Sequence, residues 1–407
     1  MRPKATPTIP YLKFIIFFII EAPIGIFFNN HCEAKTLALP LKSQVIPSGY
    51  LPRPPNKLRF HHNVSLTISI TVGTPPQNMS MVIDTGSELS WLHCNTNTTA
   101  TIPYPFFNPN ISSSYTPISC SSPTCTTRTR DFPIPASCDS NNLCHATLSY
   151  ADASSSEGNL ASDTFGFGSS FNPGIVFGCM NSSYSTNSES DSNTTGLMGM
   201  NLGSLSLVSQ LKIPKFSYCI SGSDFSGILL LGESNFSWGG SLNYTPLVQI
   251  STPLPYFDRS AYTVRLEGIK ISDKLLNISG NLFVPDHTGA GQTMFDLGTQ
   301  FSYLLGPVYN ALRDEFLNQT NGTLRALDDP NFVFQIAMDL CYRVPVNQSE
   351  LPELPSVSLV FEGAEMRVFG DQLLYRSMWM EFDLVEHRVG LAHARCDLVG
   401  QKLLGLV

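Results

Sequence analysis

The sequence predicts an all-β protein built from two similar lobes. An aspartate-centred turn occurs twice, as Asp84-Thr85-Gly86-Ser87 and as Asp296-Leu297-Gly298-Thr299, about half the chain apart. Short β-prone runs separated by Gly, Pro, Ser and Asn recur throughout, which is typical of β-rich folds. The 407 residues also exceed one ordinary domain of about 100–200 residues. We therefore expect two lobes that each carry one turn.

The two turns lie inside a longer internal repeat. Residues 84–92 align without gaps to residues 296–304, and a short apolar run precedes each copy, at 81–83 and at 294–295. Internal repeats indicate duplicated structural units. One aspartate from each lobe is therefore expected to lie at the boundary between the lobes.

Strands and helices can be assigned locally around these turns. Residues 63–72 alternate polar and apolar side chains, which is the period of a half-buried strand, and residues 79–83 form a second β-prone run. Helices are expected only at 307–318 and at 204–211.

The boundary between the lobes is expected between two strand-like runs. Residues 227–232 close the first lobe and residues 244–248 open the second. The Ser/Asn-rich stretch 182–195 is interpreted as a solvated loop. This division gives a first lobe at 59–240 and a second lobe at 241–407.

The N-terminal residues 1–34 resemble a secretory signal peptide. Basic residues precede an apolar run at 14–20, which Glu21 and Pro23 interrupt before it reaches the roughly 20 residues that a membrane span needs. We expect cleavage rather than a retained anchor, and no stable membrane span. Residues 35–58 then form a linker or a short pro-segment.

Composition favours an exported glycoprotein. Asn-x-Ser/Thr sequons extend from Asn63 to Asn347, as in chains of the secretory pathway. The expected location is extracellular (the apoplast), the endoplasmic reticulum or the vacuole. A net charge of −8 with no run of Lys or Arg argues against a nucleic-acid partner.

The cysteines favour disulfide bonds. Half of the ten lie between Cys94 and Cys144, and the chain has neither a Cys-x-x-Cys pair nor histidines at ligand spacing, so no metal site is expected. If Cys32 leaves with the signal peptide, nine cysteines remain, and one of them lacks an intramolecular partner.

Paired aspartates can activate water without a cofactor. Two carboxylates about 3 Å apart share a proton at acidic pH, because both cannot ionise cheaply. One of Asp84 and Asp296 can then accept a proton from a water that attacks a peptide carbonyl, while the other polarises that carbonyl. The alternative, two ordinary Asx turns, leaves the matched repeat unexplained.

The other turn residues support the two carboxylates. Gly86 and Gly298 are expected to allow backbone conformations that side chains exclude. Ser87 and Thr299 carry hydroxyls that can orient the neighbouring carboxylates by hydrogen bonds.

At this point the chain resembles a known family, the pepsin-like aspartic proteases, and within it the plant nepenthesin-like branch. The likeness rests on Ile83-Asp-Thr-Gly-Ser-Glu-Leu-Ser-Trp-Leu-His-Cys94, Tyr150-Ala-Asp-Ala-Ser-Ser-Ser-Glu-Gly-Asn-Leu160, Phe177-Gly-Cys179, Gly196-Leu-Met-Gly199, Phe216-Ser-Tyr-Cys219 and Asp339-Leu-Cys-Tyr342.

The resemblance implies a bilobal pepsin-like fold, a protein or peptide substrate, no cofactor and a monomer. It implies that Tyr150 lies on a flap over the active-site cleft and that Trp91 supports its hydroxyl. It also implies that residues 196–199 form a strand that fixes the first turn. Cysteines 94 to 144 resemble the cysteine-rich insertion of the branch.

The chain departs from the family pattern at two places. Family members carry Thr or Ser after each catalytic aspartate, and this chain has Thr85 but Leu297. They also carry, near positions 376–377 of this chain, a further strand with a cysteine and then the strand that braces the second turn. The resemblance implies that Cys341 would pair with that missing cysteine, while Cys219 and Cys396 still join the lobes.

These departures leave two functions open. One is an aspartic endopeptidase with Asp84 and Asp296 as its catalytic pair. The other is a catalytically impaired protein that uses the lobes for binding, like the similar xylanase-inhibitor proteins. A deletion, a spliced-out segment or a gene-model error would each account for the missing strand.

Overall fold

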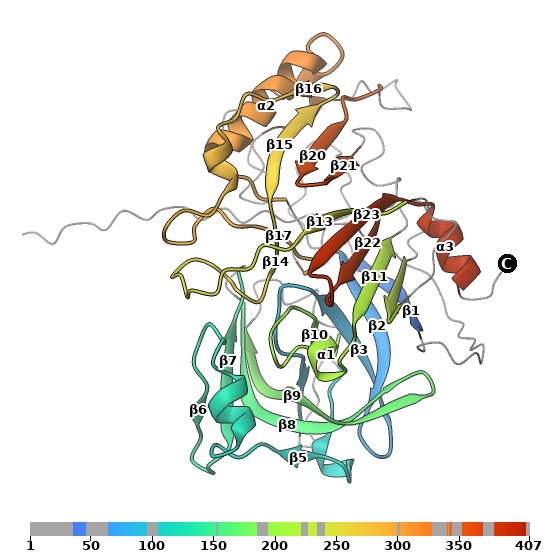
Figure 1. Cartoon of the computed structure of the whole chain (residues 1–407). Helices are drawn as coiled ribbons and strands as arrows, with labels where there is room; N and C mark the ends of the chain where they lie inside the picture. The colour runs from blue at the N-terminus through green and yellow to red at the C-terminus, as the bar shows by residue number, and fades with distance from the viewer. Residues whose placement is uncertain are drawn as a thin grey trace, which may run out of the picture.

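The computed structural model shows a β-rich chain of two lobes (Figure 1). It describes residues 36–45, 64–95, 105–151, 154–184, 194–220, 227–233, 241–298, 302–327, 340, 342–343, 352–368 and 378–403. The predicted all-β class is confirmed. The proposed signal peptide, Cys32, Thr299 and Cys341 lie outside the described residues. No helix in these ranges is long and apolar enough to cross a bilayer.

The first lobe is formed by strands that follow one another along the chain. They are β1 (Leu37–Val45), β2 (Val64–Val72), β3 (Gln77–Asp84), β4 (Trp91–His93), β5 (Thr116–Pro117), β6 (Ser137–Cys138), β7 (Cys144–Ser149), β8 (Ser155–Phe167), β9 (Ser170–Tyr184), β10 (Gly196–Gly199), β11 (Lys215–Ile220) and β12 (Gly227–Leu231). Helix α1 spans Leu207–Gln210, inside the predicted helical stretch.

The second lobe is divided into smaller sheets. Its strands are β13 (Asn243–Pro246), β14 (Tyr262–Val264), β15 (Leu266–Ile271), β16 (Lys274–Leu275), β17 (Thr293–Phe295), β18 (Arg325–Ala326), β19 (Tyr342–Arg343), β20 (Val357–Phe361), β21 (Ala364–Val368), β22 (Met378–Asp383) and β23 (Arg388–His393). Helix α2 (Gly306–Thr320) forms where predicted, with Pro307 in its first turn, and α3 (Cys396–Leu403) follows β23.

One continuous sheet joins the lobes. Its strand order β13-β23-β22-β11-β12-β1 places second-lobe strands directly beside first-lobe strands. The junction is the antiparallel pair β11 and β22, in which Lys215 faces Asp383 and Cys219 faces Trp379. In Figure 1 the red β22 lies beside the green β11 at the centre of the molecule, with β23 on the other side of β22.

Strand β1 lies within the stretch 35–58 that the sequence assigned to a linker or short pro-segment. It pairs with β12 on one side and with β2 on the other. It therefore connects the strands at the lobe junction to the remaining strands of the first lobe. Leu39 and Leu41 are 2% and 1% exposed. These leucines, two residues apart, show the period of a strand with one buried face, which the sequence analysis overlooked.

The hydrophobic core crosses the boundary between the lobes. The ring of Phe382 in β22 stacks on Phe216 in β11 at a centroid distance of 4.6 Å, and Tyr262 in β14 meets it edge-on at 4.6 Å. All three side chains are fully buried. Aromatic pairs of this geometry add about 0.5–1.5 kcal/mol each beyond their buried area.

Four disulfides are present among the described cysteines. They join Cys94 to Cys179, Cys120 to Cys138, Cys125 to Cys144 and Cys219 to Cys396. The last of these links β11 of the first lobe to α3 of the second, as the resemblance implied. The predicted preference for disulfides is confirmed.

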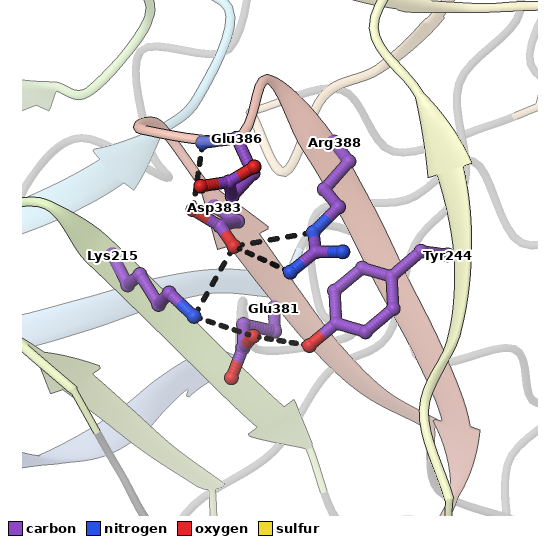
Figure 2. Close-up of polar contacts among 6 residues, drawn as sticks. All are labelled: Lys215, Tyr244, Glu381, Asp383, Glu386 and Arg388. Atoms are coloured by element: carbon purple, nitrogen blue, oxygen red, sulfur yellow. Dashed lines mark hydrogen bonds and ion pairs between the residues drawn. The ribbon is translucent and has the colours of Figure 1, made fainter.

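A buried carboxylate, Asp383, ties β11 to β22 and β23 (Figure 2). Its side chain is fully buried, 3.1 Å from Lys215 Nζ and 3.2 Å from the Arg388 guanidinium, and it accepts a hydrogen bond from the Glu386 N–H at 3.0 Å. Burial alone would raise the pKa of Asp383, but the Glu386 amide, Lys215 and Arg388 outweigh it and lower that pKa.

Tyr244 extends this cluster to β13. Its hydroxyl donates to Glu381 Oε1 at 2.7 Å, and its ring lies 4.1 Å from the Arg388 guanidinium carbon. The cluster therefore connects one first-lobe strand to three second-lobe strands. Its two cations balance its two carboxylates, which limits the cost of burying them.

We expect Asp383→Asn to destabilise the lobe junction at neutral pH. The variant leaves Lys215 and Arg388, which are 23% and 38% exposed, with Glu381 as the remaining carboxylate of the cluster. The cost should therefore lie below the roughly 3–5 kcal/mol of a fully buried pair that loses one partner. Because the folded pKa is lowered, this stabilisation exists above the unfolded pKa and is lost as pH falls through the folded pKa. The midpoint temperatures of thermal unfolding of wild type and variant should therefore converge at acidic pH.

The matched control for that measurement is Asp314→Asn on α2. Asp314 pairs with Arg313, but its side chain is 66% exposed, so the change should cost no more than about 1 kcal/mol. Equal effects of the two variants would contradict a junction held by Asp383.

Candidate active site

The first turn holds Asp84 at the end of β3. Asp84 is 7% exposed. The Gly86 N–H donates to Asp84 Oδ1 at 2.7 Å, and the Ser87 hydroxyl donates to Oδ2 at 2.5 Å. Both carboxylate oxygens are thereby fixed by the turn itself, in the manner expected for Ser87.

Strand β10 braces this turn from one side. It runs parallel to β3, with Gly199 opposite Asp84. The Met200 N–H donates to the Asp84 carbonyl at 2.9 Å, and the Gly199 N–H donates to the Ser90 hydroxyl at 3.1 Å. A Cβ on Gly199 would lie 2.8 Å from the Ser87 carbonyl oxygen, so only glycine permits this approach.

The second turn follows β17 and carries Asp296. The Gly298 N–H donates to Asp296 Oδ1 at 2.8 Å, which repeats the first-turn contact. In the described part of the chain, β17 pairs with β14 alone, whereas β3 has a strand on each side. A counterpart of β10 for this turn is therefore not among the described strands.

The two carboxylates approach each other across the lobe boundary. A Cβ on Gly86 would lie 2.6 Å from Asp296 Oδ2, and a Cβ on Gly298 would lie 2.3 Å from Asp84 Oδ1. Neither glycine has a positive φ. The expected reason for glycine, an unusual backbone conformation, is therefore wrong; these positions need glycine because each carboxylate occupies the space of the opposite side chain.

The pKa of Asp84 reflects this arrangement. Burial raises the pKa of Asp84, and the nearby Asp296 raises it further, while the Ser87 hydroxyl and the Gly86 amide oppose the change. The net result is a pKa well above the usual value for aspartate. Two adjacent carboxylates that share one proton behave in this way.

Thr85 and Leu297 connect the turns unequally. The Leu297 N–H donates to Thr85 Oγ1 at 2.7 Å, so half of the reciprocal contact expected of the family is present. The Leu297 side chain is 4% exposed and packs into the hydrophobic core. Thr85 is 1% exposed, and the Leu297 side chain has no oxygen that could accept a hydrogen bond from its N–H. A buried donor without a partner costs about 1–3 kcal/mol.

Tyr150 lies at the end of the β7–β8 hairpin. The Trp91 indole N–H donates to the Tyr150 hydroxyl at 2.6 Å, so the two aromatics meet as the resemblance implied. The hairpin closes where the Tyr150 N–H donates to the Ser154 carbonyl at 2.9 Å. Trp91 begins β4, next to β10, and thus links the hairpin to the strand that braces Asp84.

The sequence analysis missed Asn201, which holds the first turn from outside the repeat. Its Nδ2 donates to the Gly86 carbonyl at 3.3 Å, and its N–H donates to the Ser87 carbonyl at 3.1 Å. The available signal was its position two residues after the end of the apolar-apolar-Gly strand, where the chain must turn past Asp84.

We expect Leu297→Thr to be more stable than Leu297→Val, although buried threonine is usually the worse choice. The two side chains have similar shapes, but only Thr supplies an acceptor for the Thr85 N–H. The difference should be about 1–3 kcal/mol, the cost of an unsatisfied buried donor. Urea unfolding of both variants measures it, and a more stable Val variant would contradict the missing hydrogen bond.

Comparison with known proteins places this geometry in a family. A family model described as xylanase inhibitor N-terminal matches residues 67–233, and one described as xylanase inhibitor C-terminal matches residues 261–379. Two solved structures share the fold at 18% identity. The structure of edgp has a TM-score of 0.64 and covers 91% of this chain and 96% of its own. Basic 7S globulin from soybean has a TM-score of 0.60, with 88% and 96% covered.

Two curated relatives carry the name aspartic proteinase. Aspartic proteinase PCS1 of Arabidopsis thaliana is 58% identical, with 90% of this chain and 89% of that protein covered. Aspartic proteinase nepenthesin-1 of Nepenthes gracilis is 34% identical, with 74% of this chain and 65% of that protein covered. The chain therefore belongs to the pepsin-like family of plant aspartic proteinases.

Proposed function

We propose that the protein is an aspartic endopeptidase whose catalytic pair is Asp84 and Asp296. The observation that carries the proposal is the mutual approach of the turns, in which each carboxylate lies where a side chain of the opposite glycine would be. A water held between these carboxylates attacks the substrate's peptide carbonyl, which needs no cofactor.

The raised pKa of Asp84 supports a shared proton. Because the two carboxylates lie close together, the pair holds one proton at acidic pH, and the apparent pKa values belong to the pair. The protonated carboxyl of the pair donates a hydrogen bond to the carbonyl oxygen, while the ionised one accepts the proton of the attacking water. Tyr150, held by Trp91, is placed to cover a bound peptide.

The second candidate is a protein that binds other proteins without cleaving them. Leu297 favours it, because the missing hydrogen bond to Thr85 loosens the contact between the turns. Both matching family models are described as xylanase inhibitors. Tight binding of a cell-wall hydrolase, together with failure to bind pepstatin, would select this function.

We also propose that the chain is a glycoprotein of the secretory pathway and acts as a monomer outside the cytosol. Four disulfides support this location. The described sequon asparagines are all exposed: Asn78, Asn110, Asn181, Asn243, Asn277, Asn318 and Asn321.

We expect Asp84→Asn to abolish cleavage of a denatured protein between about pH 3 and 6, where wild type should be active. The variant should also alter the pH dependence of folding. A raised folded pKa stabilises the protein below the ordinary aspartate pKa of 3.8, and this stabilisation is lost as pH rises through the folded pKa. The midpoint temperature of thermal unfolding should therefore fall less for the variant than for wild type as the pH rises over this range.

The unfolding curves also show whether the Asp84→Asn variant is folded. Retained cleavage by a folded Asp84→Asn protein would contradict the catalytic pair. Absence of cleavage by folded wild type would favour the binding protein.

We expect the protein secreted from plant cells to lose mass on treatment with an N-glycosidase. Because the described sequons are exposed, several should carry glycans, each of about 1–2 kDa on a gel. A matched sample from bacterial refolding should not change in mass. An unchanged mass of the plant-derived protein would contradict the proposed route.

A further inference from the structure

Residues 200–205 connect β10 to α1 and are called the interlobe loop here because they contact both lobes. On the first-lobe side, Asn201 donates to the carbonyls of Gly86 and Ser87 at 3.3 and 3.1 Å. The loop therefore holds the turn that carries Asp84.

On the second-lobe side, the same loop holds β14. The Tyr262 hydroxyl donates to the Met200 carbonyl at 2.6 Å, and the Leu202 N–H donates to the Ser260 carbonyl at 2.8 Å. Tyr262 is fully buried and pairs with Phe295, the residue before Asp296. Since β14 is the described partner of β17, the loop reaches Asp296 through a single strand pair.

The Glu88 side chain packs beneath the loop. It is 9% exposed, and the Leu205 N–H donates to its Oε1 at 3.4 Å. A Cβ on Gly203 would lie 2.3 Å from Glu88 Cγ and 2.4 Å from Cδ, so this carboxyl fills the space under the loop. Glu88 directly follows the Asp84 turn, and it thus connects turn and loop by a second route.

The charges around Glu88 disfavour its ionised form. Burial raises the pKa of Glu88 to about 7; the Leu205 and Ser204 amides oppose this, while Asp131 and Asp258 contribute to it. Two arginines contact residues that interact with Glu88. Arg259 pairs with Asp131 at 2.5 Å, and Arg128 donates to the Ser204 carbonyl at 2.5 Å.

We propose that Glu88 is a positioning residue: its neutral carboxyl supports the interlobe loop, the loop fixes β14, and β14 locates Asp296 against Asp84. Ionisation of Glu88 loosens the loop and with it the second turn. The consequence for rate rests on the proposed protease function, whereas the consequence for the loop does not.

Hydrogen–deuterium exchange of the full chain tests the structural part. Wild type, Glu88→Gln, Glu88→Ala and the exposed control Glu353→Gln are compared at about pH 5 and about pH 8, on either side of the Glu88 pKa. Rates are corrected for the intrinsic pH dependence of exchange.

Glu88→Ala should raise exchange in 200–205, 260–264 and 293–296 at both pH values. Wild type and Glu353→Gln should show the rise in 200–205 only at the higher pH, and Glu88→Gln, which cannot ionise at this position, at neither. Segment 293–296 also responds to the Asp84 carboxyl, whose raised pKa lies in the same range, so there the expected result is a smaller rise in Glu88→Gln than in wild type. If the loop changes but 293–296 does not, or if Glu88→Gln follows wild type, the proposal is overturned. Should Glu88→Ala fail to fold, the comparison of wild type with Glu88→Gln still decides.

Kinetics on a peptide substrate separate positioning from general destabilisation. Glu88→Ala should lower kcat, with a smaller change in KM. A misplacement of about 1 Å costs roughly a hundredfold in rate, so the decrease in kcat should approach that factor. Glu88→Gln should extend activity to higher pH. If folded wild type shows no turnover, the protease function fails, and the exchange data alone judge the role of Glu88.

Discussion

The close approach of the two aspartate turns is the constraint on which the rest of the structure depends. Each carboxylate lies where a Cβ on the opposite glycine would be, so the contact depends on how the two lobes are placed relative to each other. The interlobe sheet, the aromatic stack at Phe382 and the Cys219–Cys396 disulfide all hold the lobes in one relative position. The Asp383 cluster adds directional hydrogen bonds at the same junction.

The two turns are supported differently. Asp84 is supported by β10, Asn201 and Ser87, all of which belong to its own lobe. The described contacts of the Asp296 turn include two that originate in the first lobe, through Thr85 and through the interlobe loop. The Asp296 turn is therefore held in part from the opposite lobe.

Sequence patterns predicted what is local or repeated. The strands around Asp84, helix α2 and the pairing of two aspartates followed from periodicity and the internal repeat. Patterns did not predict β1, because Pro40 lies between its two core leucines and obscures their spacing. Glu88 escaped notice for another reason: its role depends on Gly203, more than a hundred residues away, and no local signal marks such a contact.

The position of β22 also bears on how the chain is made. Tyr218 of β11 contacts Met380 of β22 across 162 residues of sequence. At a synthesis rate of about 5–20 residues per second, β11 waits roughly 8–30 s on the ribosome before its neighbour exists. During that time its edge offers unpaired backbone groups to any other strand. The last strands to be synthesised therefore cover an edge of the first lobe that has no partner until they appear.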